Sequence, residues 1–205
     1  MIVCMALILV VVHHSFGNRN DRGPRHIAMH PTLPQLYTTD EQACSVTAYA
    51  ISPDDGILTE LASVDTQPQD FPTGPPSRGA PSEIAVHPSG CCLFASNRHV
   101  PDPLPGVPQT IACIALHADG KMGQLQQLVM QHVPQGLALS KDGSTVYAVG
   151  TEDGVQGGWL SECRVRLAED GVFQELEIVG TMTLGRSTPN PTPVVAFEAP
   201  QAPRL

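Results

Sequence analysis

The chain has 205 residues, a length that suits one ordinary domain with a core of its own. Charged residues make up only 15% of it, whereas Gly and Pro number 18 and 20, so the composition favours an all-β fold of short strands and turns over long helices. The formal charge of −9 argues against a nucleic-acid partner, because proteins that bind a phosphate backbone present a basic surface.

The N-terminal segment, residues 1–22, opens with the apolar run MIVCMALILVVV. This run is too short to cross a bilayer as a helix, so we expect no membrane partner. Its length and the small residues Ser15 and Gly17 fit a secretory signal, but the basic segment that precedes such a run is missing. A partial strand is the favoured interpretation, and secretion stays open as the alternative.

An apolar strand followed by a turn then recurs three times along the chain. The copies are GPRHIAMHP from Gly23, APSEIAVHPSG from Ala80 and VPQGLALSKDG from Val133. Their prolines lie 57 and 53 residues apart, slightly more than the roughly 40–50 residues of common propeller blades. Inserted loops explain the surplus, and the proline-rich segment 99–109 is the largest candidate because its prolines forbid regular sheet pairing.

Each copy continues with three more predicted strands in the same order. The second strands are LYTTDE, LFASNR and VYAVGTE, and the third are SVTAYAIS, TIACIAL and ECRVRLA. An Asp-Gly hairpin leads into the fourth strands, ILTELASV, GQLQQLVM and VFQELEIV. Four strands make a propeller blade, so we predict blades over about 23–72, 80–132 and 133–184, a closing strand over 192–198 and a tail over 199–205. A β-sandwich is the alternative, but it gives no reason for the order to repeat.

The cysteines and histidines show no metal-ligand spacing. Six cysteines lack any C-x-x-C pair or matching Cys/His spacing, so we expect free thiols, a reducing compartment and no His-ligated metal. This favours a cytoplasmic protein. His30 and His87 each precede a proline at the same place in two copies, which indicates a repeated turn role.

Three charged residues are expected to meet at one end of neighbouring blades. Arg25 begins a first strand and Glu41 ends the second strand, so the hairpin between them brings both to the same end. Arg98 ends the equivalent second strand of the next copy. Inner strands bring such ends to the mouth of the central channel, and Arg is suited to bind phosphate or carboxylate. The alternative is a set of solvated charges or a structural salt bridge.

Three further residues are weaker candidates for contact with a ligand. His26 follows Arg25, although strand alternation would send the two side chains to opposite sides. Glu83 occupies the place of His26 in the next copy, and Asn97 precedes Arg98. We predict that His26, Glu83 and Asn97 bind substrate, the alternative being that Glu83 and Asn97 satisfy nearby backbone groups.

The motifs G-P-R-H, H-P, S-E-I, H-P-S-G and A-S-N-R resemble, in order and spacing, those of the seven-bladed β-propeller lactonase family of the 6-phosphogluconolactonase and carboxymuconate-lactonising cyclase type. The resemblance implies hydrolysis of 6-phosphogluconolactone to 6-phosphogluconate in the pentose phosphate pathway, without a cofactor. It also places active-site Arg, Glu and Arg at Arg25, Glu41 and Arg98. Glu41 would act as general base, while the two guanidiniums would hold the phosphate or the carbonyl oxyanion.

The family's ring is longer than three blades, and this affects the expected activity. We expect the chain to be part of a longer protein; the alternative is that copies associate through the open sheet edges. The third copy has Gln135 where the family carries Arg, and no residue matches a catalytic histidine that the lactonising cyclases have in an earlier blade. A catalytically inactive propeller segment or binding scaffold is therefore the alternative function.

Overall fold

Three four-stranded antiparallel sheets make up the described part of the computed structural model, which covers residues 22–68, 80–98, 108–151 and 158–184. Blade 1 contains β1 (Pro24–Met29), β2 (Gln35–Asp40), β3 (Ser45–Ile51) and β4 (Leu58–Asp65). Blade 2 contains β5 (Ala80–Val86), β6 (Cys92–Arg98), β7 (Gln109–Leu116) and β8 (Met122–Met130). Blade 3 contains β9 (Val133–Leu139), β10 (Thr145–Thr151), β11 (Gly158–Leu167) and β12 (Phe173–Leu184).

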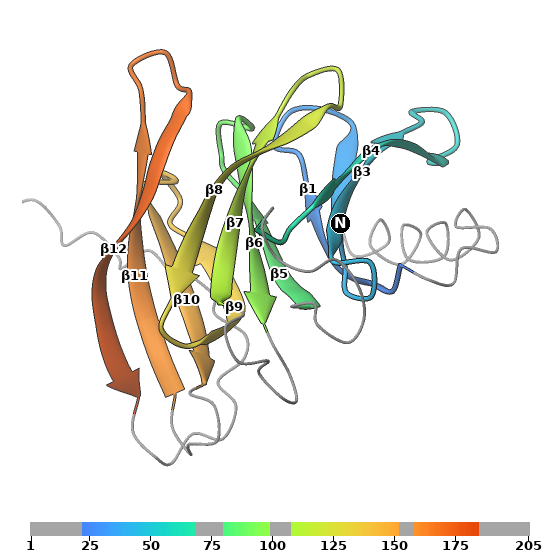
Figure 1. Ribbon diagram of the computed structural model, residues 1–205. Helices are drawn as coiled ribbons and strands as arrows, with labels where there is room; N and C mark the ends of the chain where they lie inside the picture. Colours follow the sequence, from blue (N-terminus) through green and yellow to red (C-terminus); the bar gives the residue numbers. More distant parts are fainter. Residues whose placement is uncertain (1–21, 69–79, 99–107, 152–157, 185–205) are drawn as a thin grey trace, which may run out of the picture.

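The predicted all-β propeller arrangement is confirmed by how these sheets lie. Figure 1 shows the three sheets side by side in chain order, from the blue strands to the red. The first strands are neighbours, because β1 contacts β5 and β5 contacts β9, and the outer strands β4, β8 and β12 follow the same order. The predicted closing strand over 192–198, the tail, and all of the N-terminal segment except Arg22 lie outside the described residues.

The core consists of layers between blades. Tyr37 and Val46 of blade 1 pack with Leu93 and Ile114 of blade 2. On the other face of blade 2, Phe94 lies edge to face against Phe173 of blade 3, with ring centroids 6.1 Å apart. Leu93 and Phe94 are adjacent and point to opposite faces, as strand alternation requires. Blade 2 is therefore covered on both faces, which is why β6 is buried along nearly its whole length.

A β-bulge interrupts the first strand of every blade at the same place. The pairing register shifts between Pro24 and Ile27, between Pro81 and Ile84, and opposite Val149 and Gly150 in blade 3. In blades 1 and 2 the freed amide of the bulge donates to a hydroxyl of the second strand: His26 N to Thr39 Oγ1 at 3.1 Å and Glu83 N to Ser96 Oγ at 3.0 Å. A bulge changes the direction of its side chains, so strict alternation fails at these residues.

His30 and His87 support the turns at the other end of their strands. His30 Nδ1 accepts hydrogen bonds from the amides of Thr32 and Leu33, and His87 Nδ1 accepts one from Ser89. Each ring also lies against a turn glycine of the following blade, Gly90 for His30 and Gly143 for His87, and a Cβ at either glycine would overlap the ring. Both glycines have positive φ, 75° and 77°. The turn role predicted for these histidines agrees with this geometry.

We expect the free energy of unfolding to fall as the pH drops below about 6.5, in part because of His87. Burial lowers the pKa of this imidazole from its ordinary value of 6.5. The unfolded chain therefore binds the proton at a higher pH than the folded chain, and protonation in that window favours unfolding. Urea unfolding at about pH 7.5 and about pH 5.5 measures the effect. His87→Gln should reduce the difference between the two pH values, whereas His117→Gln, at an exposed turn, should leave it as in the wild type.

Candidate functional site

Arg25, Glu41 and Arg98 form one ion cluster in the structure. Arg25 Nη1 lies 3.2 Å from both carboxylate oxygens of Glu41, and Arg98 Nη2 lies 2.9 Å from Oε1. Glu41 is held at the end of the β1–β2 hairpin by its backbone amide, which donates to the carbonyl of Gly23 at 2.8 Å. The hairpin therefore brings Arg25 and Glu41 together, as the sequence predicts, and the adjacent blade supplies Arg98.

The cluster remains accessible to solvent. The side chains of Arg25 and Glu41 are 33% and 37% exposed, and that of Arg98 is 15% exposed. Two guanidiniums against one carboxylate leave a local charge of +1 in a chain whose formal charge is −9. Among the described residues, Nε of Arg98 has no hydrogen-bond partner, so part of its donor set is unused. The arrangement can receive an anion or a developing oxyanion.

A second pair spans the same junction of blades 1 and 2. His26 Nδ1 lies 2.6 Å from Glu83 Oε1, and the side chains are 39% and 19% exposed. Both residues belong to the bulges of their strands, which explains why His26 and its neighbour Arg25 can both take part in contacts between the two blades. Thr39 Oγ1 also donates to the carbonyl of Ser82 at 3.2 Å, which holds the two bulges together.

Asn97 takes a different position from the other predicted residues. It is fully buried, and its Nδ2 donates to the carbonyl of Thr66 at 2.6 Å and to Thr110 Oγ1 at 3.0 Å. The bond to Thr66 connects blade 2 to the end of blade 1, and the bond to Thr110 lies within blade 2. Asn97 therefore lies within the packed interior and not in the ion cluster, and it satisfies a backbone carbonyl, as the alternative expectation described.

A buried carboxylate that the sequence motifs did not indicate lies next to Glu41 in the chain. Asp40 is fully buried and accepts hydrogen bonds from the hydroxyls of Thr38, Ser45 and Thr47. Burial raises the pKa of Asp40 above its ordinary 3.8, while the hydroxyl hydrogen bonds act in the opposite direction. One pattern in the sequence could have indicated this carboxylate: the second strand ends in Thr-Thr-Asp, and the third strand, which pairs with it, begins with residues that carry hydroxyl groups.

Arg22 was also missed, because it precedes the first recognisable repeat residue. Its Nη1 donates to Thr47 Oγ1 at 2.8 Å and its Nη2 to Glu60 Oε1 at 2.9 Å. Thr47 in turn donates to Asp40. The Arg22 side chain thus supports the strand end from which Glu41 projects.

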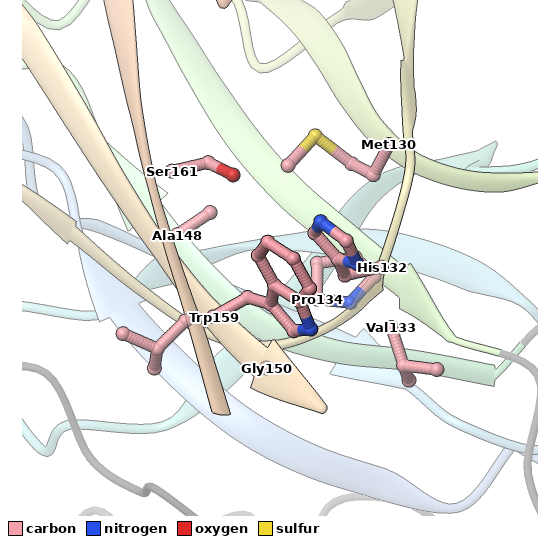
Figure 2. Close-up of a pocket in the computed structure, with 9 residues that line it drawn as sticks. Met130, His132, Val133, Pro134, Ala148, Gly150, Trp159 and Ser161 are labelled. Atoms are coloured by element: carbon pink, nitrogen blue, oxygen red, sulfur yellow. The ribbon is translucent and has the colours of Figure 1, made fainter. Parts of the chain in front are cut away.

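At the equivalent end of blade 3, the described residues at the matching places are uncharged. Gln135 and Thr151 occupy the places of Arg25 and Glu41, and Gln135 Nε2 donates to Thr151 Oγ1 at 3.3 Å. A small pocket lies near this end, where the rings of His132 and Trp159 stack with centroids 3.8 Å apart (Figure 2). The described residues that line it include no carboxylate and no guanidinium. Of the strand ends compared in the described ranges, it is the junction of blades 1 and 2 that carries the ion cluster.

The described residues offer no other reactive cluster. They contain no group of three or more His, Cys, Asp or Glu residues placed to hold a metal ion. Cys44, Cys91, Cys92, Cys113 and Cys163 are free thiols. Burial raises the pKa of Cys163 to about 12 and also raises that of Cys92 and Cys113, so these thiols stay protonated and unreactive. A helix with the length and apolar character to span a bilayer is not found in the described ranges.

Comparisons with known proteins agree with this fold. A family model described as "Lactonase, 7-bladed beta-propeller" matches residues 9–156. The 6-phosphogluconolactonase of Yersinia pseudotuberculosis (strain YPIII) is 30% identical over 132 residues, which cover 62% of this chain and 35% of that protein. A 6-phosphogluconolactonase of Cronobacter sakazakii is 27% identical over 149 residues, 68% of this chain and 41% of that protein.

A solved structure has the same fold at lower identity. The periplasmic gluconolactonase of Pseudomonas aeruginosa superposes with a TM-score of 0.57 at 18% identity, over 80% of this chain and 43% of that one. The chain therefore spans less than half the length of each of these relatives.

Proposed function

The chain belongs to the seven-bladed β-propeller lactonase family, as its motifs predicted, and from this premise we propose that the junction of blades 1 and 2 is a site of lactone hydrolysis. The observation that carries the proposal is the contact of one carboxylate with two guanidiniums from neighbouring blades. A scaffold that only packs its blades has no need of a partly exposed ion cluster at this place. Glu41, Arg25 and Arg98 are the proposed catalytic residues.

The proposed chemistry needs no covalent intermediate. A lactone is an activated ester, so a positioned water and stabilisation of the oxyanion are sufficient for its hydrolysis. Glu41 takes a proton from the attacking water. Arg25 and Arg98 stabilise the negative charge that develops on the carbonyl oxygen, or hold an anionic group of the substrate.

The proposed substrate is 6-phosphogluconolactone, which would be opened to 6-phosphogluconate in the pentose phosphate pathway. Two observations support a phosphorylated sugar lactone: the names of the curated relatives, and the local charge of +1 where Arg25 and Arg98 meet Glu41. His26 and Glu83 are proposed to contact the sugar, because their partly exposed pair lies at the same junction. We place the reaction in the cytoplasm on the basis of the free thiols; secretion is the alternative.

The test is hydrolysis of 6-phosphogluconolactone by the purified chain. The rate is measured as the release of acid and is compared with the rate of the spontaneous reaction. We expect Arg98→Ala to lower kcat/KM by about 10²-fold or more, because it removes a charged donor from the developing oxyanion or the phosphate. The matched control is Arg166→Ala, which breaks an exposed Arg–Glu pair on β11 and β12 and should leave kcat/KM unchanged. A wild-type rate equal to the spontaneous rate would favour the inactive scaffold instead.

A further inference from the structure

We propose that His26, held by Glu83, is the proton donor to the ring oxygen that leaves when the lactone opens; this assignment rests on the proposed function. The observation behind it is the contact of 2.6 Å between His26 Nδ1 and Glu83 Oε1. The hydrogen bond of the His26 ring to the described residues is made through Nδ1, and the side chain is 39% exposed. One ring nitrogen is thus fixed by a carboxylate of the next blade, and this pair spans the same two blades as the ion cluster.

His26 is a group at this junction that can hold a transferable proton before water attacks. Hydrolysis of a lactone moves two protons, one away from the attacking water and one onto the ring oxygen. Arg25 and Arg98 do not release a proton near neutral pH, and the ionised Glu41 is an acceptor. A protonated imidazole donates from both nitrogens, so one proton can bind Glu83 while the other is transferred. A base or acid that is oriented by a third group in this way is a recurring arrangement in hydrolytic sites.

Glu83 is itself held in place, which makes it suited to orient the ring. Its Oε1 also accepts a hydrogen bond from the backbone amide of Ile84 at 3.2 Å, and its own amide is bound by Ser96 Oγ. Its side chain is only 19% exposed, so the carboxylate has limited freedom to turn away. The charge of the carboxylate compensates that of the imidazolium.

Ring opening combines the attack of water on the carbonyl carbon with a proton transfer to the leaving ring oxygen. The oxygen of water bonds to the carbonyl carbon as Glu41 takes one of its protons. The bond between the carbonyl carbon and the ring oxygen then breaks, and its electron pair goes to the ring oxygen, which takes the Nε2 proton of His26. The product is a hydroxy acid, whose acid proton goes to solvent. Glu41 loses its proton to water, and His26 takes one back.

The experiment compares two substrates that differ in the leaving atom. A 6-phospho-δ-gluconolactone expels an alkoxide, which needs a proton, whereas its 5-thio analogue expels a thiolate, a much weaker base that can leave without one. We expect His26→Gln to slow the oxygen lactone by about 10²–10⁴-fold and to change the rate for the sulfur lactone by much less. Glu83→Gln should show the same selectivity to a smaller degree. His117→Gln is the control.

Three other results of this experiment would contradict the assignment of His26 as the proton donor. Equal slowing of both substrates in His26→Gln would overturn the donor role and leave a structural one. Unchanged rates for both substrates would remove His26 from the reaction. A wild-type chain that hydrolyses neither substrate would overturn the proposed function, and with it this assignment.

Discussion

Glu41→Gln is expected to reduce kcat for lactone hydrolysis by about 10²–10⁴-fold, the range of a lost general base. Glutamine has nearly the shape of glutamate but cannot take a proton from water. Binding of 6-phosphogluconate should stay unchanged or become tighter, because Arg25 and Arg98 lose the negative charge that they now contact at 3.2 and 2.9 Å. Turnover kinetics and calorimetric titration of the product measure the two effects separately.

The chain supplies a control of the same kind for this experiment. Glu177→Gln also removes a carboxylate from an ion pair with an arginine, in this case Arg166 at 2.7 Å on the exposed face of blade 3. We expect no change in kcat and a change in stability within about 1 kcal/mol, as for other exposed pairs. Unchanged turnover in Glu41→Gln would exclude Glu41 as the base. Weaker product binding with unchanged kcat would make it a positioning residue for the two guanidiniums.

Gly150→Ala is expected to lower the free energy of unfolding by at least about 3 kcal/mol. An added Cβ would overlap the backbone carbonyl oxygen of Val133 in the neighbouring strand. This obstacle cannot rotate away as a side chain can, because β9 and β10 are paired along this stretch, with Gly150 opposite Pro134. Figure 2 shows Gly150 at the base of the pocket beside Val133 and Trp159. Urea unfolding gives the loss directly.

Gly180→Ala is the matched control for this variant. Gly180 also lies in a strand of blade 3, its φ is not positive, and an added Cβ would meet nothing within 4 Å. Alanine there should be neutral or stabilising by up to about 1 kcal/mol, because it restricts the unfolded chain. A Gly150→Ala variant as stable as Gly180→Ala would mean that the close approach at Gly150 is relieved by a shift of the backbone.

The strand order could be predicted because each copy repeats its own turn signals. Gly56, Gly120 and Gly171 of the Asp-Gly pairs all adopt positive φ, as the hairpin prediction requires. The prediction was less accurate for the start of β11. We predicted that this strand begins at Glu162, whereas it begins at Gly158. Glycine is a weak strand former, and this start is stabilised by pairing with β12, whose extension to Leu184 the sequence does not mark.

The part of the candidate site that depends on one hairpin and on the repeat could be predicted from the sequence. Arg25 and Glu41 share a hairpin, and Arg98 sits at the equivalent strand end of the next copy, so their contact follows from the repeat alone. The pairing of His26 with Glu83 did not follow, since strand alternation gives the wrong direction when a bulge intervenes. The hydroxyls of Thr39 and Ser96 that bind the bulge amides were visible in the sequence, but nothing local identified their partners.

The contacts of His30 with Gly90 and of His87 with Gly143 each join a blade to the next one along the chain. In such an array the free energy of folding is close to a sum of terms for each blade and for each junction between neighbours. A substitution that weakens one junction therefore does not lower the stability of all three blades equally. Loss of the second junction would release β9 to β12 as a cooperative unit, while the first two sheets, and the ion cluster between them, would stay folded.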